Sequence, residues 1–302
     1  PYEIGRPMTK RIRKAVFPVA GLGTRVLPAT KVVPKEMLTV VDRPVLQHCV
    51  EEAREAGIEH FVFVTGRNKQ TIEDHFDLAY ELEDTLQKRG KVKELEALLA
   101  DTPAAGATSF TRQQAPLGLG HAVWCARDII GDEPFAVILP DMITLPGTRG
   151  SRCLEQCIKA HEEHGGNIIA VEEVPASDTH LYGVVSVGQD FGHTFEISGM
   201  VEKPPQGTAP SNLIISGRYV LEPQIFDILA KVEKGAGGEI QLTDGMKALA
   251  GSQPFFGVRF DGKTYDTGSK VGFLAANVAF ALSRPDIAPA FRAELKKIVG
   301  SL

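Results

Sequence analysis

The sequence predicts an α/β protein built on a doubly wound, mixed and mainly parallel sheet with an inserted β-rich lobe. Three observations lead to this fold class. Short apolar runs of strand length alternate with helical stretches through the first half of the chain, as in sheets whose strands are joined by helical crossovers. A glycine-rich loop follows the first run directly. Between residues 182 and 220 the alternation gives way to three β-rich runs separated by Gly and Pro turns.

The first half of the chain carries the alternation most clearly. The run 135–139 is apolar throughout, as expected for a central parallel strand. Pro44 opens a helical pattern that ends near Gly57. The expected elements, in order, are strand 15–19, helix 44–57, strand 61–65, helix 69–76, two surface helices within 77–100, strand 109–112, helix 118–130, strand 135–139, helix 149–164 and strand 168–171.

The second half begins with the β-rich lobe and ends in helices. The expected elements are strands 183–187, 195–202 and 213–220, helical segments 222–232 and 240–250, strand 255–260, a strand ending at Asp266, and helices 269–282 and 287–299. We expect one domain over residues 8–302. Residues 1–7 are typical of an added leader before a natural start at Met8.

Composition restricts the function. The 302 residues carry a net charge of −5, which argues against general nucleic-acid binding, because that favours a basic face. No apolar run is long enough to span a bilayer and no signal peptide opens the sequence, so we expect a cytoplasmic protein without membrane contact. The four cysteines, Cys49, Cys125, Cys153 and Cys157, do not suggest a disulfide framework, and we expect free core thiols.

The loop after the first strand is the strongest functional signal. Gly21 and Gly23 allow backbone N–H groups to approach a bound anion closely. Three cations follow, Arg25, Lys31 and Lys35, and this combination suits a polyphosphate. A dinucleotide-binding loop is the alternative, but it requires an immediate helix and an acidic residue closing the second strand. Here prolines at 28 and 34 prevent an immediate helix, and the second strand ends in Thr-Gly-Arg at 65–67 without an acidic residue. Both features disfavour a dinucleotide-binding loop.

The motifs around this loop resemble a known family. Gly-Leu-Gly-Thr-Arg at 21–25 and Pro-Lys-Glu-Met-Leu at 34–38 resemble the signature of the sugar-phosphate nucleotidyltransferases. With Pro-Ala-Thr-Lys at 28–31, the fuller form is similar to that of the bacterial UTP–glucose-1-phosphate uridylyltransferases. The resemblance covers roughly residues 12–285 and implies a Rossmann-like fold. It implies a nucleotide-binding part (12–175), a sugar-binding part (176–268) and C-terminal helices (269–302).

Two aspartates follow strands and are candidate metal ligands. Asp141 comes directly after the apolar run 135–139, and Asp266 ends a late strand. Open α/β sheets bind ligands beyond the carboxyl ends of their strands, and two carboxylates beside phosphates suit Mg²⁺. The resemblance assigns both residues to the metal. Each could instead cap a turn or a helix.

The resemblance also assigns residues to the two substrates. Gln113 corresponds to the family's base-reading glutamine, and an amide that donates and accepts suits the edge of uracil. Glu202 and Gly183 correspond to sugar contacts, and Lys203 to the residue that holds the sugar's phosphate. Alternation places neighbours on opposite faces of a strand, so Glu202 and Lys203 need a bulge or a strand end to reach one ligand. The implied nucleotide-binding residues are Ala20, Gly21, Gly23, Thr24, Arg25, Gln113 and Gly118.

These assignments imply a reaction. The phosphate of glucose 1-phosphate attacks the α-phosphorus of UTP and pyrophosphate leaves, with Arg25, Lys35 and Lys203 as catalytic cations and Mg²⁺ as cofactor. The family implies a homo-oligomer, a dimer or a tetramer. The alternatives are a thymidylyltransferase for the same sugar phosphate, a catalytically silent nucleotide-sensing subunit of the same fold, and a dinucleotide-dependent oxidoreductase.

Overall fold

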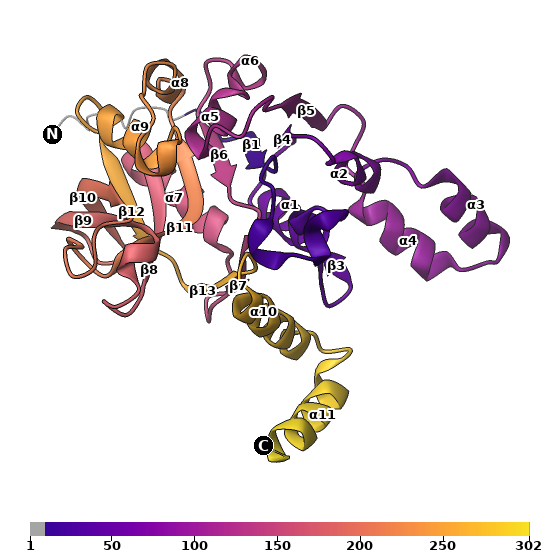
Figure 1. Cartoon of the computed structure of the whole chain (residues 1–302). Helices are drawn as coiled ribbons and strands as arrows, with labels where there is room; N and C mark the ends of the chain where they lie inside the picture. Colours follow the sequence, from indigo (N-terminus) through magenta and orange to yellow (C-terminus); the bar gives the residue numbers. More distant parts are fainter. Residues whose placement is uncertain (1–9, 302) are drawn as a thin grey trace, which may run out of the picture.

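The computed structural model describes residues 10–301 (Figure 1). The expected leader 1–7 and start at Met8 lie outside the described residues. Within these limits the chain forms one nine-stranded sheet with helices on both faces. The doubly wound α/β class predicted from the sequence is therefore confirmed.

Nine strands make up the main sheet, and two short ladders accompany it. The strands of the main sheet are β1 (Lys14–Pro18), β4 (His60–Thr65), β5 (Thr108–Arg112), β6 (Phe135–Ile138), β8 (Asn167–Glu173), β9 (Gly183–Asp190), β10 (Thr194–Glu202), β11 (Leu213–Leu221) and β12 (Phe255–Arg259). One short ladder pairs β2 (Thr39–Val40) with β3 (Arg43–Pro44), and the other pairs β7 (Met142–Pro146) with β13 (Gly262–Asp266).

The helices lie around this sheet. They are α1 (Val45–Glu55), α2 (Gln70–His75), α3 (Tyr80–Lys88), α4 (Val92–Asp101), α5 (Leu119–Trp124), α6 (Arg127–Ile130), α7 (Cys153–His164), α8 (Ile225–Leu229), α9 (Leu242–Leu249), α10 (Lys270–Ser283) and α11 (Ala288–Gly300). Three 3₁₀ turns interrupt the loop after β1, at Thr24–Val26, Ala29–Lys31 and Lys35–Met37.

The strand order in the main sheet is β5-β4-β1-β6-β11-β8-β12-β10-β9. Strands β5, β4, β1 and β6 run parallel, so their carboxyl ends share one edge. The sheet is mixed, as expected, but antiparallel pairing takes a larger share than expected, because β11 runs against both β6 and β8. The β-rich lobe is present as β9, β10 and β11. These strands extend the main sheet, with β11 at its centre, instead of forming a sheet of their own.

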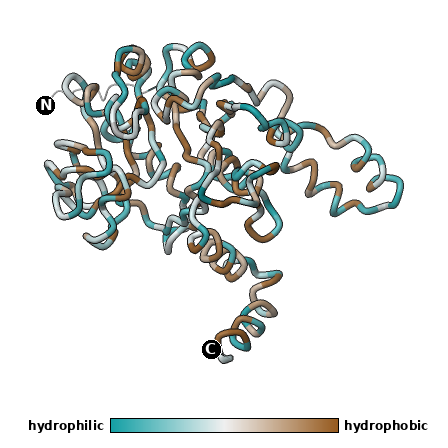
Figure 2. Tube along the Cα trace, viewed as in Figure 1, coloured by the Kyte–Doolittle hydropathy of each residue, from teal (hydrophilic) through white to brown (hydrophobic). Residues whose placement is uncertain are grey.

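Alternation along the strands divides the core into two halves. In β1, Ala15 and Phe17 pack in one cluster with α1 and α7, whereas Val16 packs in the other with α5, α8 and α9. Both clusters are fully buried at the sheet, and hydrophobic residues concentrate along its central strands in Figure 2. The division of the chain into nucleotide-binding and sugar-binding parts stays a prediction, since one sheet passes through both.

Several expected boundaries were wrong. The helix expected over 118–130 is two short helices, α5 and α6, broken at Cys125 and Ala126. Helix α7 begins at Cys153, not at residue 149, and α8 covers only five residues of the expected segment 222–232. The sequence also gave no indication of the short strands β2, β3 and β7. Of the cysteines, three are buried and Cys125 is half-buried, and all four are free.

Two helical pairs project from the body (Figure 1). Helices α3 and α4 form one projection, and α10 and α11 form the other. In the projection of α10 and α11, Val271, Leu274, Ile298 and Val299 are all exposed. No helix between residues 10 and 301 has the length and apolar character that a membrane crossing requires.

A buried ion pair joins the two halves of the chain beneath the edge of the sheet. Arg218 of β11 donates two hydrogen bonds to Glu52 of α1, at 3.1 and 2.8 Å, and neither side chain is more than 1% exposed. Burial alone would raise the pKa of Glu52, but Arg218 and further hydrogen bonds lower it below its ordinary value. Arg218 also donates to the carbonyl oxygen of Leu139, at 3.2 Å. The pair therefore supports the segment that leads to Asp141.

Replacing Arg218 is expected to cost far more stability than breaking a surface pair. Arg218→Met leaves the Glu52 carboxylate buried without its partner, so the free energy of unfolding should fall by about 3–5 kcal/mol. The measurement is urea unfolding, with Lys88→Met as control, because Lys88 and Asp84 form an exposed pair whose loss should cost at most about 1 kcal/mol. Equal losses in the two variants would contradict the prediction.

Candidate active site

The glycine-rich loop turns sharply as it leaves β1. Gly23 takes a φ of 66°, a left-handed conformation that favours glycine. The Thr30 hydroxyl donates to the carbonyl oxygen of Gly23 at 2.7 Å. A Cβ on Gly23 would lie 3.2 Å from both Thr30 and Lys35 side-chain atoms. The loop is therefore folded back on itself, and this brings Lys35 under its glycines.

Two adjoining hollows lie along this loop. The first has a volume of about 340 Å³ and the second of about 650 Å³. Thr24, Leu119 and Glu239 line both. The first hollow contains these predicted nucleotide-binding residues: Ala20, Gly21, Gly23, Thr24, Gln113 and Gly118. The second contains Arg25, Asp141, Gly183, Glu202, Lys203 and Asp266. Of the predicted site residues, only Lys35 lines neither, and it bonds to Asp141 beneath the second.

A backbone crossing forms the floor of the first hollow. Gly118 has a φ of 108°, and a Cβ there would lie 2.7 Å from the carbonyl oxygen of Ile240. The N–H of Ile240 donates to the carbonyl oxygen of Leu117 at 2.7 Å. Gln113 is 8% exposed and its amide donates to Gly118 and lies 3.0 Å from His121 Nδ1. The glutamine is thus held at the hollow by the loop that the glycines permit.

Asp141 and Asp266 meet in the second hollow, but by a different route from the one predicted. We expected the two aspartates to meet because each follows the end of a parallel strand. Instead, Asp266 ends β13, which pairs antiparallel with β7 and places Asp266 opposite Met142. The N–H and hydroxyl of Thr267 both donate to the carbonyl oxygen of Asp141, at 2.8 Å. The helix-cap alternative for Asp266 fails, because Ser269 accepts the capping hydrogen bond of α10.

Two cations lie against the two carboxylates. Lys35 Nζ lies 2.6 Å from Asp141, and the Arg25 guanidinium lies 3.6 Å from Asp141 and 3.8 Å from Asp266. Burial would raise the pKa of Asp141, but Lys35 and Arg25 lower it below its ordinary value. Burial and repulsion from Asp141 raise the pKa of Asp266. Asp266 is paired less closely than Asp141, and the two carboxylates that face this hollow are the hard oxygen ligands that a divalent cation takes.

Glu202 and Lys203 reach the same hollow because the strand ends between them. Glu202 is the last residue of β10, and Lys203 follows it with a φ of 46°. This left-handed step replaces the alternation that would have put the two side chains on opposite faces. Gly183 lies beside them, since a Cβ on it would be 3.0 Å from the Glu202 carboxylate.

Sequence reasoning missed some of the residues that complete the site. Thr243 was not among the predicted site residues, but its hydroxyl donates to the Glu202 carboxylate at 2.7 Å inside the second hollow. Glu239 lines both hollows. Nothing in the sequence pattern places residues 238–244 near the glycine-rich loop; the hydrogen bond from Ile240 to Leu117 brings them there in the fold.

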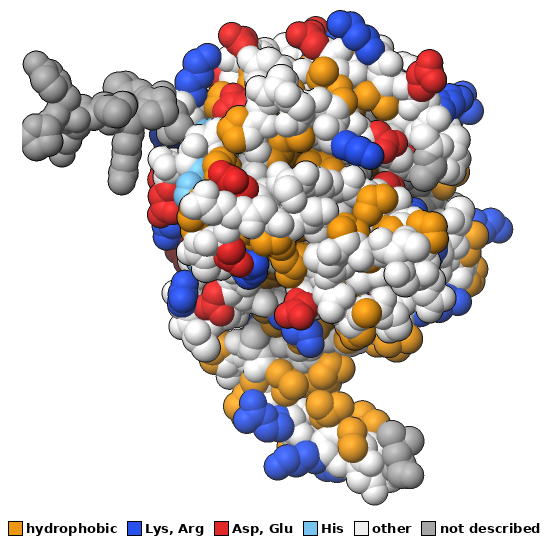
Figure 3. All heavy atoms as spheres, turned by 90° about the vertical axis from the view of Figure 1, so that its left-hand side faces the viewer, with side chains coloured by type: hydrophobic (Ala, Val, Ile, Leu, Met, Phe, Trp, Pro, Cys, Tyr) orange, Lys and Arg blue, Asp and Glu red, His pale blue; other side chains and the backbone are white. Residues whose placement is uncertain are grey.

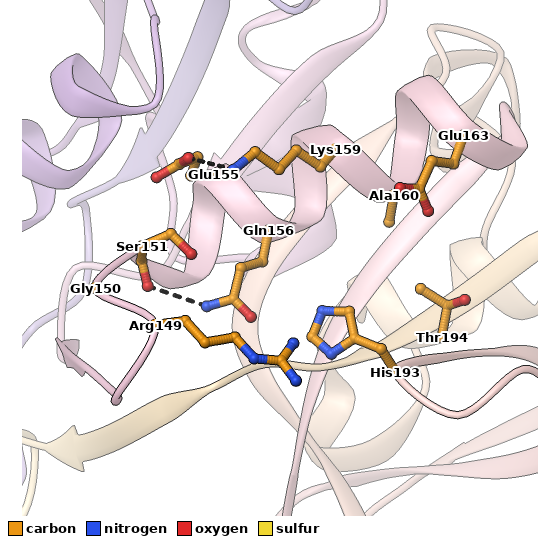
Figure 4. Close-up of a pocket in the computed structure, with 10 residues that line it drawn as sticks. All are labelled: Arg149, Gly150, Ser151, Glu155, Gln156, Lys159, Ala160, Glu163, His193 and Thr194. Atoms are coloured by element: carbon orange, nitrogen blue, oxygen red, sulfur yellow. Dashed lines mark hydrogen bonds and ion pairs between the residues drawn. The ribbon is translucent and has the colours of Figure 1, made fainter.

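A third, separate hollow of about 570 Å³ contains none of the predicted residues (Figure 4). It lies between α7 and the start of β10, where His193 and Arg149 face the helix. Gln156 at its base is fully bonded, to Ser151 and to the backbone of Asp261. The arrangement is that of a polar surface groove and not of a reaction site.

The fold and the two adjoining hollows define a transferase that handles phosphates. A family model described as nucleotidyl transferase matches residues 14–282, which is most of the chain. A UTP–glucose-1-phosphate uridylyltransferase of Komagataeibacter xylinus is 51% identical over 264 residues, covering 87% of this chain and 92% of the relative. The chain belongs to the nucleotidyl transferase family, in the branch of the UTP–glucose-1-phosphate uridylyltransferases.

Solved structures agree with this placement. A UTP-bound UGPase from Acinetobacter baumannii matches with a TM-score of 0.87 and 42% identity, covering 94% of this chain and 98% of that one. A UDP-glucose pyrophosphorylase complexed with UDP-glucose matches with a TM-score of 0.81 and 41% identity, covering 90% of this chain and all of that one (100%).

Gly118 should tolerate a side chain less well than a glycine of positive φ that lies in open space. A Cβ on Gly118 meets the backbone of Ile240, whereas a Cβ on Gly131, with a φ of 70°, meets nothing within 4 Å. Gly118→Ala should therefore reduce the free energy of unfolding by roughly 1–3 kcal/mol more than Gly131→Ala. Chemical unfolding of both variants tests this. Equal losses would show that backbone conformation alone, and not the contact with Ile240, requires glycine.

Proposed function

We propose that this chain transfers a uridylyl group from UTP to α-D-glucose 1-phosphate, giving UDP-glucose and pyrophosphate. The observation that carries the proposal is the pair of adjoining hollows, one beside the glycine loop and Gln113, the other containing Glu202, Lys203 and two aspartates. The first suits a nucleoside and the second a sugar phosphate. Membership of the uridylyltransferase branch supports the choice of substrates.

The first hollow would bind the nucleotide. Gln113 reads the edge of the uracil, and the close backbone at Gly118 and Ala20 lies against the base. Gly21, Gly23 and Thr24 bring backbone N–H groups to the phosphates. Arg25 follows on the same turn and extends from the loop toward the second hollow.

The second hollow would bind the sugar phosphate. Glu202, held by Thr243, accepts hydrogen bonds from sugar hydroxyls, and Gly183, which lines the same hollow beside Glu202, contacts the sugar. Lys203 places its ammonium on the sugar's phosphate. A phosphate oxygen of the sugar attacks the α-phosphorus of UTP, the bond from that phosphorus to the bridging oxygen breaks, and pyrophosphate leaves with the electron pair. The attacking oxygen is already anionic, so positioning and charge neutralisation suffice.

Asp141 and Asp266 would hold Mg²⁺. Both carboxylates line the second hollow, and Mg²⁺ usually takes one or two protein carboxylates together with phosphate oxygens. When bound, the ion lowers the repulsion between the two anionic substrates. Arg25 and Lys35, which pair with these carboxylates in the structure, are expected to turn toward the phosphates.

The proposal extends to assembly and location. Apolar side chains gather on the projection of α10 and α11 (Figure 3), and Val271, on the first turn of α10, is 79% exposed. A face of this kind suits a second copy of the chain, so we expect a homo-oligomer. Charged, phosphorylated substrates and free buried thiols favour the cytoplasm.

The proposed activity is tested by pyrophosphate release. The chain should release pyrophosphate from UTP with glucose 1-phosphate, and more slowly with dTTP in its place. Faster release with dTTP would favour the thymidylyltransferase alternative. Binding of UTP without any release, across several sugar 1-phosphates, would favour the nucleotide-sensing alternative.

The two aspartates should act as a unit. Asp141→Asn and Asp266→Asn should each keep the fold but lose most turnover, because an amide is a poorer, uncharged ligand. If they hold one ion, the double variant should be little worse than either single one. The measurement is kcat across a Mg²⁺ titration. Losses that multiply, or full activity of Asp266→Asn at limiting Mg²⁺, would contradict a shared site.

A further inference from the structure

The amide nitrogen of Gln113 is fully used inside the protein. It lies 3.0 Å from the carbonyl oxygen of Gly118 and 3.0 Å from Nδ1 of His121. A carbonyl oxygen only accepts hydrogen bonds, so the amide must face Gly118 with its nitrogen and not with its oxygen. An amide nitrogen carries two hydrogens, and these two contacts take both of them.

The same geometry fixes the state of the His121 ring. Because the Gln113 nitrogen donates, Nδ1 must accept, and the ring proton therefore lies on Nε2. The thiol of Cys125, which is also a donor, lies 3.8 Å from the same Nδ1. Burial and the nearby Arg127 guanidinium lower the pKa of His121 below its ordinary value. The ring is therefore neutral at pH 7, and Nδ1 keeps its lone pair.

Aromatic packing holds the His121 ring in place. The ring stacks on Trp124, with the ring centres 5.8 Å apart and the planes at 30°. The Arg127 guanidinium in turn lies 3.7 Å from the centre of the Trp124 ring. These residues belong to α5 and α6, which follow the loop of the first hollow directly. The stack restricts rotation of the imidazole, so Nδ1 stays directed at Gln113.

Only the carbonyl oxygen of Gln113 is left for a ligand. Gln113 lines the first hollow, and no group within residues 10–301 donates a hydrogen bond to its Oε1. This oxygen is not sealed in the core. A base in the first hollow therefore meets an acceptor at Gln113, and no donor.

An acceptor at this position separates the pyrimidine bases. N3 of uracil and N3 of thymine each carry a hydrogen, whereas N3 of cytosine carries a lone pair. A cytosine placed in the same way would bring that lone pair against the Gln113 oxygen and leave both groups unpaired. Polar groups left unpaired in a closed site are costly, and this cost is what rejects a wrong substrate.

We propose that His121 is a positioning residue that sets base specificity: by occupying one N–H of Gln113, it makes the amide present only its oxygen to the base. The inference rests on the proposed function and deepens it, because it names the group that makes the nucleotide site prefer an N3 hydrogen. Turning the amide round to suit cytosine breaks two hydrogen bonds, to Gly118 and to His121. Without Nδ1 of His121 the same turn breaks only one.

The test is the preference for UTP over CTP. His121→Phe keeps an aromatic ring against Trp124 and removes Nδ1. The ratio of kcat/KM for UTP to that for CTP should then fall by roughly tenfold, which corresponds to one hydrogen bond. The ratio of UTP to dTTP should not change, because thymine carries the same N3 hydrogen. Each ratio is measured on one preparation, so any loss of folded protein cancels.

Two further variants separate positioning from a merely structural role. His121→Asn should keep most of the preference for UTP, because Oδ1 of asparagine is bonded to Cγ, as Nδ1 is in histidine, and also accepts. His164→Phe is the matched control. His164 is half-buried, stacks on Phe256 and bonds to the Thr194 hydroxyl, but it lines neither of the two hollows. Its removal should leave both ratios unchanged.

Three results would overturn the proposal. They are an unchanged ratio of UTP to CTP in His121→Phe, an equal fall in the ratio of UTP to dTTP, and a loss of preference in His121→Asn or His164→Phe as large as in His121→Phe. Isothermal titration with UMP and CMP gives the same comparison without turnover. Failure of the proposed function is a separate result, because it would appear as no pyrophosphate release from UTP and glucose 1-phosphate by the unaltered chain.

Discussion

The site depends on one buried ion pair more than on any other contact. Glu52 binds Arg218 and also accepts from the Thr144 hydroxyl and the Leu154 backbone. These four residues belong to α1, β11, β7 and α7, which come from three separate parts of the sequence. Removing two charges from water is costly unless all their hydrogen bonds are made. The buried pair is therefore stable only when these elements keep the arrangement that makes those hydrogen bonds. This arrangement also supports the segment that leads to Asp141, because Arg218 donates to the carbonyl oxygen of Leu139.

The remaining site residues follow from where strands end. Four parallel strands bring the glycine loop, Gln113, Arg67 and Asp141 to one edge of the sheet, as general α/β geometry requires. The sugar side is built differently. Glu202 ends an antiparallel strand, and the left-handed step at Lys203 turns the next side chain into the same hollow. The backbone strain at this step is the kind that persists where the surrounding structure holds it.

The sequence was sufficient for the parts of the fold that local pattern controls. The apolar run of β6 and the loop at 21–25 identified the parallel edge, because strand periodicity and glycine content are local properties. A strand ending at Asp266 was expected, but β7 and its pairing with β13 were not predictable in this way. Its strands are five residues each and lie more than a hundred residues apart, and they become strands only by pairing. We therefore predicted correctly that Asp141 and Asp266 meet, but for the wrong reason. The antiparallel pairing of β7 with β13 brings them together, and not the ends of two parallel strands.

Contacts between side chains explain the remaining features of the site that the sequence did not predict. Thr243 is one of several hydroxyl residues in the chain, and only the fold places it against Glu202. The folded state likewise decides which cations are paired with a carboxylate. Lys35 and Lys69 are each paired with a carboxylate, at 2.6 and 2.7 Å, whereas Lys31 and Arg67 have no ion-pair partner within residues 10–301. Charge alone does not distinguish these four residues in the sequence. Burial distinguishes them, because a buried cation must be paired where it lies, whereas an exposed one stays available to an incoming phosphate.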